Sequence, residues 1–115
     1  MSKGEDEFEL QLRAIGFGGW VREYKFHPTR KWRLDFAHPE LMIAVEVEGI
    51  TFYGKNKDGS MKLGRHQTGK GMEADLEKYQ EAMLLGWLVY RVSPAMVTKG
   101  VALQTLETLI GLKGK

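Results

Sequence analysis

The sequence contains no cysteine, which excludes disulfide bonds, thiolate nucleophiles and zinc sites built from thiolates. It also lacks a long hydrophobic run: no apolar stretch approaches the roughly 18 residues that a membrane-spanning helix needs, so no membrane is expected as a partner. The N-terminal stretch MSKGEDEFEL is acidic and polar, unlike a secretory signal. A cytoplasmic setting is therefore the default expectation.

The remaining composition is that of an ordinary globular domain. Hydrophobic residues make up 43% of the 115 residues, a share at which disorder is not expected. The length fits one domain with one core over residues 1–115. The formal net charge of +2 says little about partners, whereas the distribution of that charge says more.

Hydrophobic periodicity predicts an α/β domain in the element order α-β-β-β-α-β-α, with a mixed sheet and helices packed on it. The predicted elements are a helix at 5–15, strands at 21–27, 32–36 and 41–48, a helix at 72–85, a strand at 87–92 and a helix at 99–112. The first helix is expected to bury Phe8, Leu12 and Ile15. The second is expected to bury a stripe formed by Met72, Leu76, Tyr79 and Met83.

Three carboxylates interrupt two of the most apolar strands. Side chains alternate along a strand, so Glu46 and Glu48 share one face of the stretch MIAVEVE. A short hairpin allows Asp35, in the preceding strand, to lie across from them. Three converging carboxylates suit Mg²⁺ or Mn²⁺, since these ions prefer oxygen ligands. A solvated face is the alternative, but the surrounding strand is too apolar for a free edge.

The stretch RLDFAHPELMIAVEVEG, followed by GRH, D..K, A...GW and YRV, resembles the PD-(D/E)XK nuclease superfamily. It is similar to the branch with very-short-patch repair-type and phage-associated endonucleases, and the VRR-NUC branch is a close relative. The resemblance covers residues 5–92 and implies a restriction-endonuclease-like αβββαβ core, with a mixed central sheet flanked by helices. It implies that Asp35 and Glu46 are the principal ligands of one or two Mg²⁺ (or Mn²⁺) ions, and that Glu9 is the acid of the first helix. A phage or its bacterial host is the setting it suggests.

The sequence departs from that superfamily at position 48, where lysine is usual and Glu48 stands here. Glu48 would serve as a further ligand or a general base, but it cannot supply positive charge. Some relatives recruit a lysine from the following helix, and Lys78 is that candidate, with Lys70 as a second. An exposed Lys78 that pairs with Asp75 is the alternative.

The glycine-rich segment 49–71 has little hydrophobic periodicity and reads as a long structureless loop. Its basic residues are expected to contact the phosphates of DNA, and a mobile solvated loop is the alternative. These residues are Lys55, Lys57, Lys62, Arg65 and Lys70. His66 is a further candidate for phosphate binding or proton transfer, against the alternative of a surface histidine.

Two functions are therefore predicted from the sequence. The first is a Mg²⁺-dependent DNA endonuclease, structure-selective in phage DNA processing or repair, with Asp35, Glu46, Glu48 and Lys78 as catalytic residues. The second is a non-catalytic nucleic-acid-binding module that keeps a degenerate nuclease fold. A homodimer would allow both strands of a duplex to be cut, and the apolar residues of 101–112 either serve that purpose or complete the core.

Overall fold

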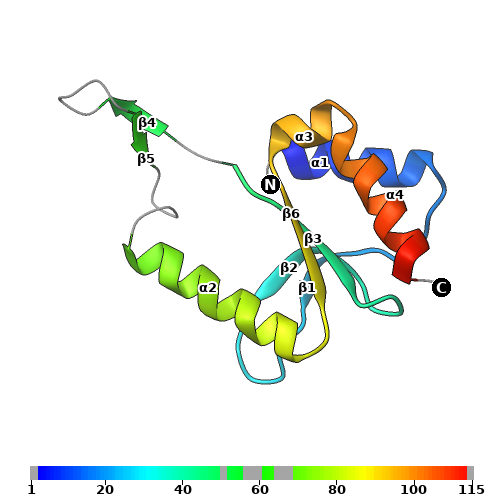
Figure 1. The fold of residues 1–115 in the computed structure, drawn as a ribbon, viewed down its shortest axis with the longest axis horizontal. Coiled ribbons are helices and arrows are strands. Elements are labelled where there is room, and N and C mark those ends of the chain that lie inside the picture. The colour runs from blue at the N-terminus through cyan, green and yellow to red at the C-terminus, as the bar shows by residue number, and fades with distance from the viewer. Residues whose placement is uncertain (1–2, 50–51, 56–60, 64–68, 114–115) are drawn as a thin grey trace.

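The structure is a computed structural model that describes residues 3–49, 52–55, 61–63 and 69–113, with side chains for 3–49 and 73–113. Figure 1 shows its elements, which contain the predicted α-β-β-β-α-β-α order with additions. In chain order they are α1 (Lys3–Ala14), β1 (Val21–Lys25), β2 (Arg33–His38), β3 (Ile43–Val47), β4 (Phe52–Lys55), β5 (Met61–Leu63), α2 (Gly69–Leu84), β6 (Leu88–Val92), α3 (Pro94–Thr98) and α4 (Val101–Lys113). In the part of the chain that is described, no helix has the length and apolar character that a membrane span requires.

The main sheet is mixed, as predicted, and has the strand order β1-β2-β3-β6. β1 pairs with β2 and β2 with β3 in antiparallel fashion, whereas β3 and β6 are parallel. β3 is buried along its whole length, which confirms its central position. Because β3 and β6 run in the same direction, their carboxyl ends meet at one edge of the sheet.

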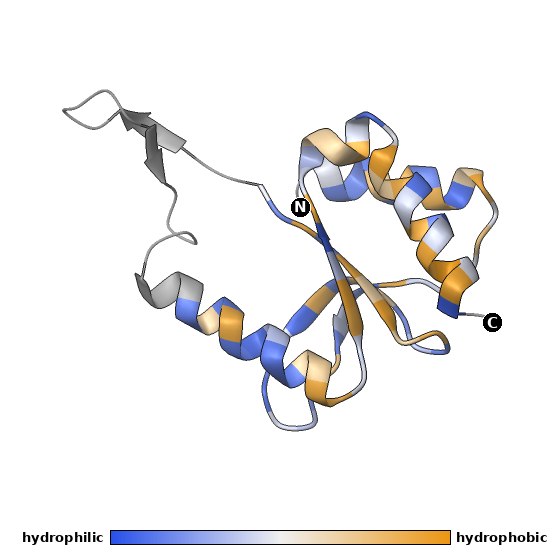
Figure 2. Ribbon diagram, viewed as in Figure 1, coloured by the Kyte–Doolittle hydropathy of each residue, from blue (hydrophilic) through white to orange (hydrophobic). Residues whose placement is uncertain are grey.

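Helices cover both faces of this sheet, with α2 on one face and α1, α3 and α4 on the other (Figure 1). The alternation along β3 follows the prediction: Val45 packs in the core under α1, α3 and α4, and Ala44 packs with Ala82 of α2. In Figure 2 hydrophobic residues run along the sheet between the two helical layers. In α4, Ala102 and Leu106 are fully buried in the core, whereas Val101 and Leu112 are 42% and 64% exposed, so only part of the apolar surface of this helix completes the core.

The first helix packs through Phe8 and Leu12, which lie one turn apart and are buried. The Phe8 ring meets the Phe36 ring edge-on, with 5.3 Å between the centroids. The predicted third member of this face, Ile15, is instead 43% exposed. The reason is that the helix ends at Ala14 and the chain turns away at Gly16, whose φ of 69° suits glycine.

The predicted buried stripe of α2 is wrong in part: Tyr79 does face the sheet and Met72 lies outside the described side chains, but the other two members are exposed. Leu76 is 60% exposed and Met83 is 65% exposed, whereas Ala82 is fully buried. The helix is rotated because small residues on both sides, Ala82 and Ala44, allow close approach to the sheet. The positions that face the sheet are therefore 75, 78, 79 and 82, which follow an i, i+3, i+4, i+7 pattern.

The expectation of a structureless 49–71 segment is wrong in part, because β4 and β5 pair as a separate antiparallel sheet. The predicted DNA contacts of this segment lie outside the side chains that the structure describes. They are Lys55, Lys57, Lys62, Arg65, His66 and Lys70. At the C-terminus the predicted single helix is preceded by the short α3, whose N-cap Ser93 accepts a hydrogen bond from the Met96 N–H at 3.2 Å.

Candidate active site

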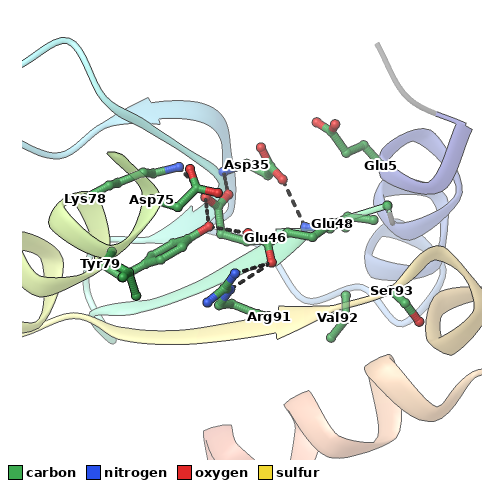
Figure 3. A pocket seen from close by; sticks show the side chains of 13 residues that line it. Glu5, Asp35, Glu46, Glu48, Asp75, Lys78, Tyr79, Arg91, Val92 and Ser93 are labelled. Atoms are coloured by element: carbon green, nitrogen blue, oxygen red, sulfur yellow. Dashed lines mark hydrogen bonds and ion pairs between the residues drawn. The ribbon is translucent and has the colours of Figure 1, made fainter. Parts of the chain in front are cut away.

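A pocket of about 730 Å³ lies at the carboxyl ends of β3 and β6, between the start of α1 and one face of α2 (Figure 3). Five carboxylates and two cations are among its described lining residues, so the lining is formally negative. The acids are Glu5, Asp35, Glu46, Glu48 and Asp75, and the cations are Lys78 and Arg91. The carboxyl end of parallel strands is a common position for ligand sites in α/β proteins.

Asp35 and Glu46 are fixed against each other by hydrogen bonds between the neighbouring strands β2 and β3. The backbone N–H of Asp35 donates to Glu46 Oε2 at 2.6 Å, and the N–H of Val47 donates to Asp35 Oδ2 at 2.9 Å. Glu46 is only 2% exposed. A buried carboxylate is costly unless hydrogen bonds or a cation compensate, and Glu46 has such partners. The structure thus brings together the two residues predicted to be the principal acids.

Burial, together with the negative charges of Glu46 and Glu5, raises the pKa of Asp35 to about 8. The hydrogen bond from the Val47 N–H acts in the opposite direction and is the weaker influence. A nearby cation would reverse this shift, because it favours the ionised carboxylate. The crowding of oxygen ligands around Asp35 therefore fits a hard divalent cation.

Lys78 and Tyr79 reach into the pocket from α2, next to each other on the helix surface that faces the sheet (Figure 3). The Lys78 ammonium donates to Glu46 Oε1, and its side chain is 16% exposed. The alternative of an exposed Lys78 paired with Asp75 is therefore wrong. The Tyr79 hydroxyl lies 2.5 Å from Glu48 Oε1 and 3.2 Å from Glu46 Oε1. Burial and the charge of Glu46 raise the pKa of Tyr79, so its hydroxyl remains a proton donor.

Glu48 is engaged by side chains at both of its oxygens. Oε1 accepts from Tyr79, while Oε2 accepts from Arg91 Nε at 2.8 Å and forms an ion pair with Arg91 Nη2 at 2.7 Å. The Arg91 guanidinium also lies over the Tyr79 ring, 4.4 Å from its centroid. Desolvation lowers the pKa of Arg91, but Glu48, Tyr79 and Asp75 together raise it by more.

The first helix places Glu5, rather than Glu9, at the pocket. Glu9 lies outside the pocket lining and pairs with Arg22 at 3.4 Å. Glu5 lies one turn earlier. Its carboxylate forms a cluster with those of Asp35 and Glu23, and each residue offers an oxygen within 4.8 Å of the others. Glu23 has a φ of 53°, a conformation that is uncommon outside glycine.

Gly4 positions the start of α1. A Cβ atom at Gly4 would lie 3.1 Å from Val47 Cγ1 and 3.3 Å from Pro94 Cβ, so the absence of a side chain permits close packing on β3 and α3. Glu5 is delivered to the pocket by this approach.

Sequence reasoning missed Glu5 and Arg91 as pocket residues, and the reasons differ. Glu5 carried a usable signal, because residues four apart share a helix face and Glu5 stands four before the predicted Glu9. Arg91 lies in the YRV stretch that contributes to the family resemblance, but the sequence assigns it no role, because its place beside Glu46 follows from the parallel register of β3 and β6. That register depends on a crossover of about 40 residues and is not readable from local pattern.

The element order and the mixed sheet define an α/β fold with an acidic pocket at one sheet edge. This fold is similar to a solved structure titled "Homing Endonuclease I-Bth0305I Catalytic Domain", with a TM-score of 0.62 and 12% sequence identity, covering 97% of this chain and 96% of that one. At this identity the likeness establishes a shared fold. No family model matches the chain. A search of curated proteins finds no match either.

Proposed function

We propose that this protein is a metal-dependent endonuclease that hydrolyses DNA phosphodiester bonds. The observation that carries the proposal is the hydrogen-bonded Asp35–Glu46 pair, in which Glu46 is buried and pairs with Lys78, at the carboxyl end of the central strands. The fold of an endonuclease catalytic domain supports it, as does the resemblance of the Asp35-to-Glu48 stretch to the PD-(D/E)XK pattern. The same resemblance suggests repair or phage DNA processing as the setting.

Asp35 and Glu46 would hold Mg²⁺ or Mn²⁺, with Glu5 supplying a further carboxylate from α1 in place of the predicted Glu9. Such an ion supplies Lewis-acid stabilisation of a phosphoryl oxygen and lowers the pKa of a bound water. The donor chemistry fits, because Asp35 is crowded by negative charge and its carboxylate lies with those of Glu5 and Glu23 in a group whose oxygens are within 4.8 Å of one another, while Glu46 lies beside Asp35.

The chain's own residues orient and balance the charges of this centre. The Asp35 N–H fixes one oxygen of Glu46, and Lys78 offsets the charge at the other. Lys78 would thereby take the place of the lysine that position 48 lacks, with its positive charge held beside Glu46.

Cleavage of labelled linear, single-stranded, mismatched and four-way-junction DNA tests this function, in Mg²⁺, Mn²⁺ or EDTA. We expect metal-dependent cleavage that Glu46→Gln and Asp35→Ala abolish while DNA binding persists. Glu40→Gln is the matched control, because it removes one exposed carboxylate outside the pocket. Cleavage that Asp35→Ala leaves intact would show that the site is assigned wrongly.

A non-catalytic DNA-binding module is the second candidate, and Glu48 at the usual lysine position favours it. Binding without cleavage in every metal and substrate would support that candidate. Size-exclusion chromatography, with the same cleavage assay on each fraction, tests whether the active species is a homodimer.

A further inference from the structure

Glu48 was predicted as a metal ligand or a general base, but its surroundings indicate a different task. Its carboxylate is shared between the Tyr79 hydroxyl and the Arg91 guanidinium, one oxygen to each. Both oxygens of Glu48 are thus committed to side chains within the pocket wall. This arrangement restrains Arg91, which receives an edge contact from Glu48 and a face contact from the Tyr79 ring.

Arg91 is the accessible cation of the pocket. In the parallel register of β3 and β6, Arg91 is the partner of Glu46, so its side chain shares the sheet face of the acidic pair. The Arg91 side chain is 48% exposed, whereas that of Lys78 is 16% exposed and engaged with Glu46. The contacts of Arg91 with Glu48 use Nε and Nη2, and Nη1 has no hydrogen-bond partner among the described residues.

A phosphate that enters this pocket meets a formally negative lining, so it needs positive charge beyond a bound metal ion. Guanidinium is suited to this role, because it is permanently charged and its planar donors match phosphate oxygens. Its fixed orientation also reduces the conformational entropy that would be lost when it contacts a ligand.

We propose that Arg91 binds a non-bridging oxygen of the phosphodiester in the pocket, and that Glu48 is the positioning residue that orients it. The inference rests on the proposed nuclease function and deepens it. It also accounts for Glu48: positive charge reaches the pocket from the neighbouring strand, and the acid at position 48 holds it there.

The chain offers a closely matched control in Arg30. Its side chain is 49% exposed, it pairs with Glu77 at 2.6 Å, and it lies 4.0 Å from the centroid of the Trp32 ring. Arg30 is outside the pocket lining. Arg30→Ala therefore removes the same charge, the same kind of ion pair and the same kind of ring contact as Arg91→Ala.

The test measures single-turnover cleavage and DNA binding for Arg91→Ala, Arg91→Lys and Arg30→Ala, with folding checked by circular dichroism. We expect Arg91→Ala to slow cleavage roughly ten- to hundredfold, the scale of a lost charge-assisted hydrogen bond, with a smaller change in Kd. Arg91→Lys should restore little of the cleavage rate, because an ammonium group lacks the planar pair of donors of a guanidinium. Arg30→Ala should cleave at the wild-type rate.

Two further measurements separate a phosphate contact from a structural effect. A neutral methylphosphonate at the cleaved position should slow cleavage by the wild type. It should slow cleavage by Arg91→Ala much less, because the contact between Arg91 and the phosphate is already absent in that variant. Glu48→Gln, which can still accept from Arg91, should retain more activity than Glu48→Ala. Equal methylphosphonate effects in wild type and Arg91→Ala would overturn this inference alone. A wild-type protein that neither binds nor cleaves DNA would overturn the proposed function and this inference with it.

Discussion

At the scale of single residues, the titration of Asp35 makes the stability of the protein depend on pH. Its pKa is raised to about 8 from an ordinary value of 3.8, first by burial and then by Glu46. The folded protein therefore binds this proton more tightly than the unfolded chain does. The free energy of unfolding should fall as pH rises from about 4 to about 8, since the folded state must give up a proton that it holds firmly.

Asp35→Asn removes this titration, so in EDTA its stability should depend less on pH across that range than the wild type's. The expected result is a flatter plot of urea midpoint against pH, in which the stability of the variant relative to wild type is greater at pH 8 than at pH 5. Urea unfolding at pH 5 and pH 8 measures it, with the exposed substitution Glu40→Gln as control. Parallel plots of urea midpoint against pH for wild type and Asp35→Asn would contradict the raised pKa of Asp35.

Lys78 is predicted to stabilise the protein as well as serve its site. Lys78→Met leaves Glu46 buried without its cation, a change that typically costs about 3–5 kcal/mol. Adding Glu46→Gln to Lys78→Met should recover part of that loss, because no buried charge then remains. Denaturant unfolding of the two single variants and the double variant checks this. A double variant whose loss equals the sum of the single losses would show that the pair is not coupled.

At the scale of elements, α2 depends on a small residue for its position. Ala82 is fully buried against the Ala44 face of the sheet, and Lys78 and Tyr79 are aimed into the pocket by the same orientation. Ala82→Leu should therefore destabilise the fold by about 1–3 kcal/mol through overpacking and should also displace the two pocket residues.

Met83→Leu, one position further along α2, is the control for Ala82→Leu. Met83 is 65% exposed, so its substitution should change stability by less than about 0.5 kcal/mol. Thermal unfolding and cleavage of both variants provide the comparison. Equal effects at the two positions would mean that the orientation of α2 is not set by Ala82.

The same helix shows why the sequence predicts some features and not others. The α/β class, the order of elements along the chain and the faces of β3 follow from local periodicity, and the structure agrees with them. The buried face of α2 could not be predicted in this way, because its sheet-facing stripe is mostly polar. The sequence predicts a buried Tyr79 and names Lys78 as a candidate for the site, but periodicity alone assigns a charged position such as Asp75 to solvent. Arg91 was not predicted as a pocket residue for a related reason, since the residues that it contacts are distant in sequence.

At the scale of the whole molecule, a divalent cation should stabilise the fold, because it binds a carboxylate cluster that exists only when α1, β2 and β3 are assembled. At a hundredfold excess over Kd, binding adds about 2.7 kcal/mol to the free energy of unfolding. Thermal midpoints should rise by several degrees in Mg²⁺ or Mn²⁺ and return with EDTA. Glu46→Gln should lose most of this rise, whereas Glu40→Gln should retain it. An unchanged wild-type midpoint at millimolar metal would contradict the assigned metal site.

The pocket joins partners that lie at very different separations along the chain. Asp35 and Glu46 are 11 residues apart, in a hairpin that can close early in folding, whereas Glu48 and Arg91 are 43 apart. A folding chain therefore gathers carboxylates before the arginine of β6 arrives. The late docking of that strand should be accelerated by electrostatic attraction, so salt, which screens this attraction, should slow refolding and leave the unfolding rate nearly unchanged. In this protein the charges of the pocket would guide the order in which the fold is completed.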